Sequence, residues 1–101
     1  MKTTIADNGA TMVATFEGRL DTAAAVKTGQ DIQPLIDNAD KEIVLDCHQL
    51  DYISSSGLRL FLSIRKAAAA KGGKVIIEGI NSDLRQVFTM TGFFNLFEIR
   101  D

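Results

Sequence analysis

The chain has 101 residues, the size of one ordinary domain, so we expect a single domain over residues 1–101. Hydrophobic residues make up 46% of the chain and charged residues 24%, a globular composition that excludes disorder as a global description. Eleven basic residues against thirteen acidic ones give a formal net charge of −2. The basic residues are scattered along the chain, which argues against nucleic acid as a partner.

Membrane, secretion and metal binding are also disfavoured. No apolar run reaches the roughly 18 residues that a bilayer span needs, and the opening MKTTIADNG lacks the apolar core of a secretory signal. We therefore expect a cytoplasmic protein without direct membrane insertion. The single cysteine, Cys47, and the single histidine, His48, exclude an internal disulfide and leave too few ligands for zinc, so we expect no metal and no cofactor. We interpret Cys47 as a small buried residue and His48 as a surface residue of a loop.

The chain begins with a pattern typical of a β-hairpin. Two extended runs, Thr3–Ala6 and Thr11–Glu17, flank the pair Asn8-Gly9, which supplies the two positive-φ positions of a tight turn. Apolar and polar residues alternate in the second run. This run is therefore predicted to be a strand with at least one buried face.

A helix and a buried strand follow the hairpin. Asp21 is a good N-cap for the alanine-rich stretch after it, and the helix is predicted to run to about Asn38. Gly29 and Pro34 weaken its middle, where we expect a kink or a break. The compact apolar run Glu42–Asp46 predicts a central parallel strand that is buried on both faces.

The second half of the chain predicts two more helix–strand units. The serine segment ISSSGLRLFLSIRK opens a helix that Gly72 can end in the left-handed conformation, and KVIIEG is a second buried strand. Asn81 or Ser82 caps a helix that ends at Gly92, and a short last strand lies around Phe97–Ile99. The predicted class is α/β, a mixed sheet with an N-terminal hairpin and with helices packed on the sheet.

Three adjacent serines, Ser54, Ser55 and Ser56, precede Gly57 at the start of the predicted helix. One serine is enough to cap the helix. A serine nucleophile is disfavoured, because the G-x-S-x-G elbow is absent and His48 has no evident reason to face these hydroxyls. The remaining interpretation is a phosphorylation switch, since a helix N-terminus tolerates a phosphate that would strongly change what docks there.

Helix geometry ranks the three serines. At about 100° per residue with Leu58 as origin, Ser55 lies near the polar direction of Arg59, while Ser54 lies near the apolar side and suits a cap. Ser56 falls farther around, beside Ser63. Ser55 is therefore expected to be the most exposed of the three, and Arg59, one turn on, is placed to pair with a phosphate on it.

The apolar arc of this helix is broad, and two interpretations of it stay open. Either the helix is wedged deeply between the sheet and a neighbouring helix, or part of the arc is left for a partner protein. The arc consists of Leu58, Leu60, Phe61, Leu62 and Ile64.

Three segments occur in the order and at the separations of a known family. They are GRLDTAAA (residues 18–25), IVLDCHQLDYISSSGLRLF (43–61) and VFTMTGFFNLFEI (87–99). In them the chain resembles the STAS domain family, and within it the stand-alone bacterial anti-sigma factor antagonists. The first is similar to the family's Gly-x-Leu-Asp segment, the second to its strand-loop-serine-helix signature and the third to its C-terminal Thr-Gly-x-x-x-Leu-Phe segment. The resemblance covers nearly the whole chain and implies a STAS-like single domain.

The resemblance implies a function. In the family, an anti-sigma factor that is also a GHKL-type serine kinase phosphorylates the first Ser of an Asp-Ser-Ser/Thr-Gly motif. The unphosphorylated antagonist binds this kinase and frees a sigma factor, and a PP2C-type phosphatase resets it. Carried over, the phosphoacceptor is Ser55, with Ser56 and Ser54 as alternates. Ser54 stands where the motif has Asp, and Asp51 lies three residues upstream. The implied partner-binding residues are Asp21, Ser54, Ser56, Gly57, Leu58 and Arg59.

Two non-enzymatic functions therefore remain. The leading hypothesis is an anti-sigma factor antagonist that is switched off by phosphorylation at a helix N-terminus. The alternative is a constitutive STAS subunit of a membrane lipid transporter or of a stress-signalling scaffold, which the absence of the motif Asp keeps open. A hydrolase is a distant third.

Overall fold

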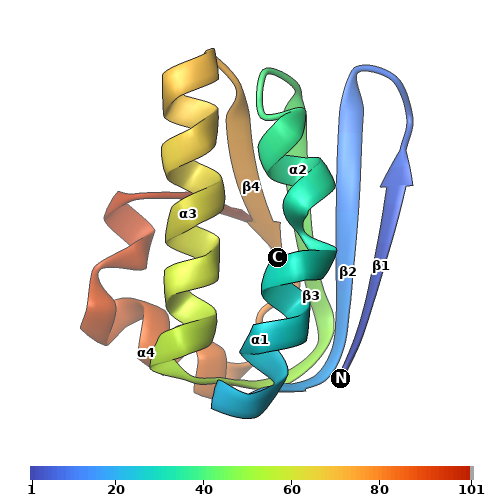
Figure 1. Ribbon diagram of the computed structural model, residues 1–101. Coiled ribbons are helices and arrows are strands. Elements are labelled where there is room, and N and C mark those ends of the chain that lie inside the picture. The colour runs from blue at the N-terminus through green and yellow to red at the C-terminus, as the bar shows by residue number, and fades with distance from the viewer. Residues whose placement is uncertain (101) are drawn as a thin grey trace.

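The computed structural model describes residues 1–100, which form five strands and four α-helices. Figure 1 shows how these elements are arranged. None of these helices is long and apolar enough to cross a membrane. The elements are β1 (Lys2–Asp7), β2 (Thr11–Leu20), α1 (Thr22–Asp31), α2 (Gln33–Asp37), β3 (Glu42–Ile53), α3 (Ser55–Lys71), β4 (Lys74–Glu78), α4 (Ser82–Thr91), the 3-10 turn η1 (Phe93–Asn95) and β5 (Glu98–Arg100).

The strands form one mixed sheet in the order β1-β2-β3-β4-β5. The hairpin strands β1 and β2 are antiparallel, and every later neighbour is parallel, as crossover helices require. The predicted α/β class, with an N-terminal hairpin and helices packed on the sheet, is confirmed.

The core lies between the helices and one face of the sheet. Figure 1 shows α1, α2 and α3 on the same side of the strands. Along β2 and β3, fully buried residues such as Phe16 and Leu45 alternate with half-buried ones such as Val13 and Val44. Along β2 and β3 the sheet therefore has a covered face and a more open face, whereas in β4 three consecutive residues, Val75–Ile77, are buried and both faces are covered. The expectation that Glu42–Asp46 is buried on both faces was wrong, because Val44 and Asp46 are only half-buried and Glu42 is exposed.

β3 continues well past the predicted end at Asp46. The end of β2 also continues, and the two strands stay paired as far as Leu20 and Ile53. His48 is therefore in a strand rather than a loop, although it is exposed as expected, and its Nδ1 lies 2.6 Å from Asp46 Oδ1. Cys47 is buried as predicted, and desolvation, with a smaller contribution from Asp46, raises the pKa of its thiol.

The predicted helix after the hairpin is broken into α1 and α2 at Ile32. Pro34 lies in the first turn of α2, where its missing N–H costs nothing, so the break falls where proline predicts it. Gly29 does not interrupt α1. A Cβ at Gly29 would lie 3.4 Å from Leu60 Cδ2, so the glycine brings α1 close to α3. The last strand is β5, one residue later than predicted, and the turn η1 before it was not predicted.

Candidate functional site

Two helices begin side by side at the carboxyl edge of the sheet. The neighbouring strands β2 and β3 end together, since Leu20 pairs with Ile53 and the Ser54 N–H donates to the Leu20 carbonyl at 2.8 Å. Each strand leads directly into a helix: Asp21 caps α1 and Ser54 caps α3. The fold therefore places two positive helix N-termini next to each other.

Ser54 is the cap that helix geometry predicted. It is buried, and its Oγ accepts a hydrogen bond from the Gly57 N–H at 3.2 Å. Gly57 is needed for a different reason, because a Cβ there would lie 2.8 Å from both Ile53 Cγ1 and Leu20 Cγ. The missing side chain lets the first turn of α3 press against the ends of both strands.

The other two serines differ in exposure, as the azimuth ranking predicted. Ser55 is exposed and Ser56 is half-buried. The first turn of α3 contains no acidic residue. Within residues 1–100, the N–H groups of Ser55 and Ser56 have no protein acceptor. The start of α3 is thus a positive, uncompensated helix end that carries a free hydroxyl.

Two predicted partner-binding residues flank this hydroxyl. Asp21 is half-buried, and its Oδ1 accepts the Ala24 N–H at 2.8 Å, so this carboxylate stabilises α1 and leaves α3 without a negative charge. Arg59 is exposed one turn into α3. Its side chain forms no ion pair with any described residue. A guanidinium one turn from Ser55 is available to a phosphate there.

The apolar arc of α3 is mostly buried, but it is not wholly covered. Phe61 and Ile64 are fully buried, Leu58 is half-buried at the margin of the core, and Leu62 remains 37% exposed. On the neighbouring helix α1, Val26 is 71% exposed. Val26 was not among the predicted binding residues. The buried residues of α1 lie on another side of this helix, which leaves Val26 facing away from the core.

The described residues show no catalytic partner for the serines. The hydrogen bonds of His48 run from its ring and its backbone to Asp46 on the open face of the sheet, not to Ser55. Within residues 1–100, no group of three His, Cys, Asp or Glu side chains is arranged to hold a metal ion.

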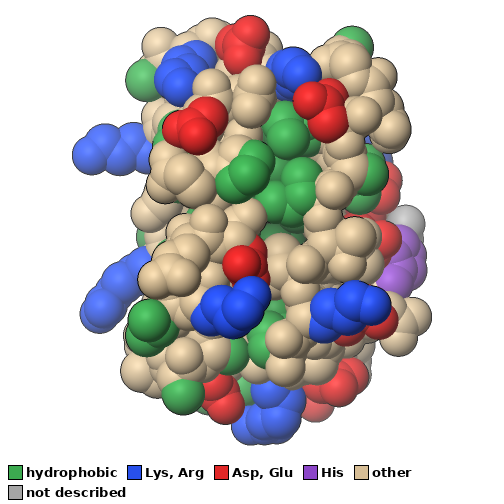
Figure 2. Space-filling model, turned by 45° about the vertical axis from the view of Figure 1, so that its right-hand side comes forward, with side chains coloured by type: hydrophobic (Ala, Val, Ile, Leu, Met, Phe, Trp, Pro, Cys, Tyr) green, Lys and Arg blue, Asp and Glu red, His purple; other side chains and the backbone are tan. Residues whose placement is uncertain are grey.

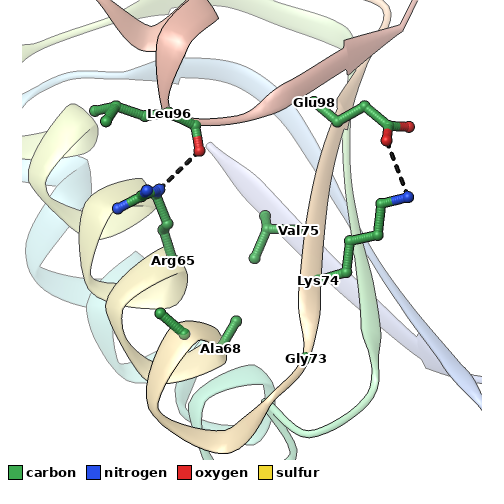
Figure 3. Close-up of a pocket in the computed structure, with 8 residues that line it drawn as sticks. Arg65, Ala68, Gly73, Lys74, Val75, Leu96 and Glu98 are labelled. Carbon is green, nitrogen blue, oxygen red and sulfur yellow. Dashed lines mark hydrogen bonds and ion pairs between the residues drawn. The ribbon is translucent and has the colours of Figure 1, made fainter.

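A hollow of about 270 Å³ lies away from the serines, between the second half of α3, β4 and the start of β5. Figure 3 shows its charged side chains already partnered: Arg65 Nε donates to the Leu96 carbonyl at 2.7 Å, and Lys74 pairs with Glu98 at 2.9 Å. Ala68 and Val75 also line it. No unpaired charge is directed into the hollow, so it offers little to a polar ligand.

The chain belongs to the STAS domain family, whose sequence pattern matches residues 2–101. Among curated proteins, it is 29% identical over 99 residues to BtrV of Bordetella bronchiseptica, which is named an anti-sigma factor antagonist. That match covers 98% of this chain and 85% of BtrV.

Solved structures of the same kind share the fold. An anti-sigma factor antagonist from Thermotoga maritima superposes with a TM-score of 0.88 at 18% identity, over 98% of this chain and 86% of that one. The antagonist SpoIIAA in its unphosphorylated form gives 0.77 at 22% identity, over 99% and 88% of the two chains. The phosphorylated form of SpoIIAA from Bacillus gives 0.74 at 22% identity, over 97% and 90%. At these identities the likeness concerns the fold.

Proposed function

We propose that this chain is an anti-sigma factor antagonist, a binding module that phosphorylation of Ser55 switches off. The observation that carries the proposal is the exposed Ser55 hydroxyl at the start of α3, a helix that has no acidic residue in its first turn. The names of the similar proteins support the same class of function.

The physical basis of the switch is charge at a rigid surface. Transfer of a phosphoryl group to Ser55 Oγ, with loss of the hydroxyl proton, adds between one and a half and two negative charges, roughly, at neutral pH. The α3 N-terminus, the free backbone N–H groups and Arg59 all favour this charge, so the helix stays folded. A partner surface that fits the uncharged start of α3 would have to strip water from the phosphate dianion or would repel it. In either case binding is lost.

The partner in this proposal is an anti-sigma factor that is also a GHKL-type serine kinase. The unmodified chain binds the kinase and frees a sigma factor, and a PP2C-type phosphatase later removes the phosphate. We place this cycle in the cytoplasm. The proposed contact surface is the edge where α1 and α3 begin. Around Ser55 it comprises Asp21, Ser56, Leu58 and Arg59, and we add the exposed apolar residues Val26 and Leu62. Ser54 and Gly57 are buried and support this surface from beneath rather than forming part of it.

A phosphorylation assay tests the proposal directly. The full chain is incubated with ATP and the GHKL-type kinase from its own organism, and the phosphate is located by mass spectrometry. We expect one phosphate on Ser55, and Ser55→Ala should abolish it. Ser82→Ala is the matched control, because Ser82 is also exposed at the first position of a helix. Phosphate on Ser82, or full labelling of Ser55→Ala, would contradict the assignment to Ser55.

The second candidate, a constitutive STAS subunit of a lipid transporter or a signalling scaffold, is favoured by one observation. Ser54 caps α3 without the charge that Asp supplies in the family motif. Affinity purification of the tagged chain from its own cells separates the two functions. Recovery of a GHKL-type kinase supports the antagonist, whereas recovery of transporter ATPase and permease subunits supports the alternative.

A further inference from the structure

The edge strand β1 presents a regular, unpaired backbone edge. Asn8 N donates to the Thr11 carbonyl at 2.8 Å, which fixes the alternation of bonds along the hairpin. Because hydrogen-bonded and non-hydrogen-bonded pairs alternate between antiparallel strands, the even residues of β1 bond to β2. The N–H and C=O groups of Thr3, Ile5 and Asp7 therefore point outward from the sheet.

The two edges of the sheet differ in how they are protected. β5 has three residues, and Glu98 and Arg100, which pair with each other, place charge on it. β1 has six residues in unbroken register with β2, without proline and without a bulge. Short length, charge, proline and bulges are the usual devices that block edge-to-edge pairing, and the middle of β1 has none of them.

The outward edge of β1 adjoins an apolar hollow. Figure 2, in which the β1 side of the molecule comes forward, shows hydrophobic side chains gathered in a depression framed by acidic and basic ones. Ile5 of β1 and Ile36 of α2 are half-buried and pack against the core. Thr3 Oγ1 is buried and makes no hydrogen bond within residues 1–100. The covered face of the sheet is thus left incomplete at β1.

We propose that β1 pairs antiparallel with β1 of a second copy of this chain, with Ile5 opposite the partner's Ile5, so that two sheets join into one. Antiparallel pairing about a two-fold axis keeps the helices of both copies on the same face and makes the interface self-complementary. Opposed residues must then lie on the same face and both point their backbone groups outward. Thr3 opposite the partner's Asp7, together with Ile5 opposite Ile5, uses every outward group of the strand.

Side chains fit this register as well as the backbone does. Thr3 lies opposite the partner's Asp7, whose carboxylate has acceptor capacity left beside its bonds to Lys41 and the Gly9 N–H. Those two groups also lower the pKa of Asp7, which keeps it charged. The Thr3 hydroxyl is buried and unpartnered in one chain, and a rotation of this side chain would bring it to that carboxylate. The basic end of each β1, at Lys2, runs beside the acidic hairpin end of the other. No like charges oppose each other, and the two apolar hollows meet at the axis.

The proposed dimer is independent of the proposed function. Ser55 lies at the carboxyl end of β3, and β2 separates β3 from the dimer edge. The contact is one strand pair with its flanking hollow, which places it among small, concentration-dependent interfaces. Ser55→Asp should leave dimerisation unchanged, and a monomeric variant should still be phosphorylated.

Sedimentation equilibrium over a concentration series tests the association. We expect the average mass to rise toward twice the monomer mass with concentration, and Ile5→Lys, which opposes two like charges at the axis, should lower the association constant at least tenfold. Thr4→Lys is the matched control: it adds the same charge to the same strand on the open face, and it should change association less than threefold. A wild-type chain that stays monomeric up to about 1 mM would overturn the proposal.

Cysteine cross-linking tests the register and does not depend on the stability of Ile5→Lys. Native Cys47 is buried and does not compete. Ile5→Cys should form a disulfide-linked dimer on mild oxidation, since directly opposed Cα atoms lie about 5.5 Å apart. In the same register, residue 4 of one chain and residue 4 of the second chain lie two positions apart along the paired strands. In Thr4→Cys their Cα atoms are therefore about 8 Å apart, beyond disulfide reach. Cross-linking through Thr4→Cys and not through Ile5→Cys would overturn the proposed pairing.

Discussion

The N-termini of α3 and α4 are built from the same local chemistry but lie in different surroundings. Each has a polar cap whose side chain accepts the N–H three residues later, at 3.2 Å for Ser54 and 2.8 Å for Asn81. Each then presents an exposed serine at the first helical position, Ser55 or Ser82. α4 carries Asp83 in its first turn, whereas α3 carries no acid there.

Under the proposed function, this difference favours Ser55 over Ser82 as the phosphorylation site. Asp83 already compensates the positive end of α4, so a further charge at Ser82 changes little. The end of α3 is uncompensated, and it lies beside the start of α1 because β2 and β3 are neighbours. The residue three positions after the cap also differs. It is Gly57 in α3, where the strand ends press close, and Leu84 in α4, where a side chain fills the core.

Matched aspartate variants should separate the two helix ends most strongly. Ser55→Asp should weaken binding to the GHKL-type kinase by at least about 100-fold, because a fixed charge in a desolvated contact repels or must be buried. Ser82→Asp should bind within about twofold of wild type, since rim charges outside an interface contribute little. Isothermal titration calorimetry measures both. Equal weakening by the two variants would show that the contact includes α4.

The second comparison concerns Gly57. Gly57→Ala places a methyl group 2.8 Å from Ile53 and Leu20, and we expect a loss of about 1–3 kcal/mol in the free energy of unfolding. Gly72→Ala is the control at the other end of α3. There the new methyl meets no atom within 4 Å, but the residue has φ +80°, and about 1 kcal/mol of backbone strain is expected. Urea denaturation gives both values, and a Gly57→Ala protein as stable as wild type would show that the strand ends yield easily.

Removing each cap should sharpen the comparison further. Ser54→Ala leaves the Gly57 N–H unsatisfied in buried surroundings, so we expect a loss of about 1–2 kcal/mol in unfolding free energy. Asn81→Ala leaves the Leu84 N–H unsatisfied in part-buried surroundings and also removes the bond from Asn81 Nδ2 to the Leu50 carbonyl, and it should cost about 0.5–1 kcal/mol. Ser54→Asp, which restores the residue of the family motif, should keep the stability of wild type. If Ser54→Ala costs less than Asn81→Ala, burial does not strengthen the α3 cap.

Much of the fold could be predicted because the turns and helix ends depend on local chemistry. Asp21 and Ser54 mark helix starts, and Gly72 adopts the left-handed conformation that ends α3. Asn8-Gly9 marks the place of the hairpin, but the expected pair of positive-φ positions was wrong: only Gly9 has a positive φ, because Asn8 bonds to Thr11 and the turn residues are Gly9 and Ala10. The azimuth of Ser55 likewise follows from helix geometry alone.

What could not be predicted depends on contacts between distant segments. The polar run after Asp46 has no strand signal of its own, and it is extended because β2 continues beside it. The adjacency of the two helix N-termini follows from the strand order and not from either helix. The exposure of Val26 and Leu62 depends on how α1 packs against α3, which the composition of either helix leaves open.

The smallest effect is on stability rather than binding, and it tests the electrostatic difference by itself. Ser55→Asp places the first acid in the first turn of α3 and should raise the free energy of unfolding by about 0.3–1 kcal/mol. Ser82→Asp should give less, because Asp83 is already present, and Asp83→Asn should lose a similar small amount. In the double variant Ser82→Asp/Asp83→Asn, the loss should be recovered. Thermal denaturation at low and high salt distinguishes this charge effect from packing, since about 1 M salt should screen it. A Ser55→Asp protein that is less stable than wild type would mean that the carboxylate of Asp21 outweighs the helix end, and a phosphate at Ser55 would then strain the fold as well as block the partner.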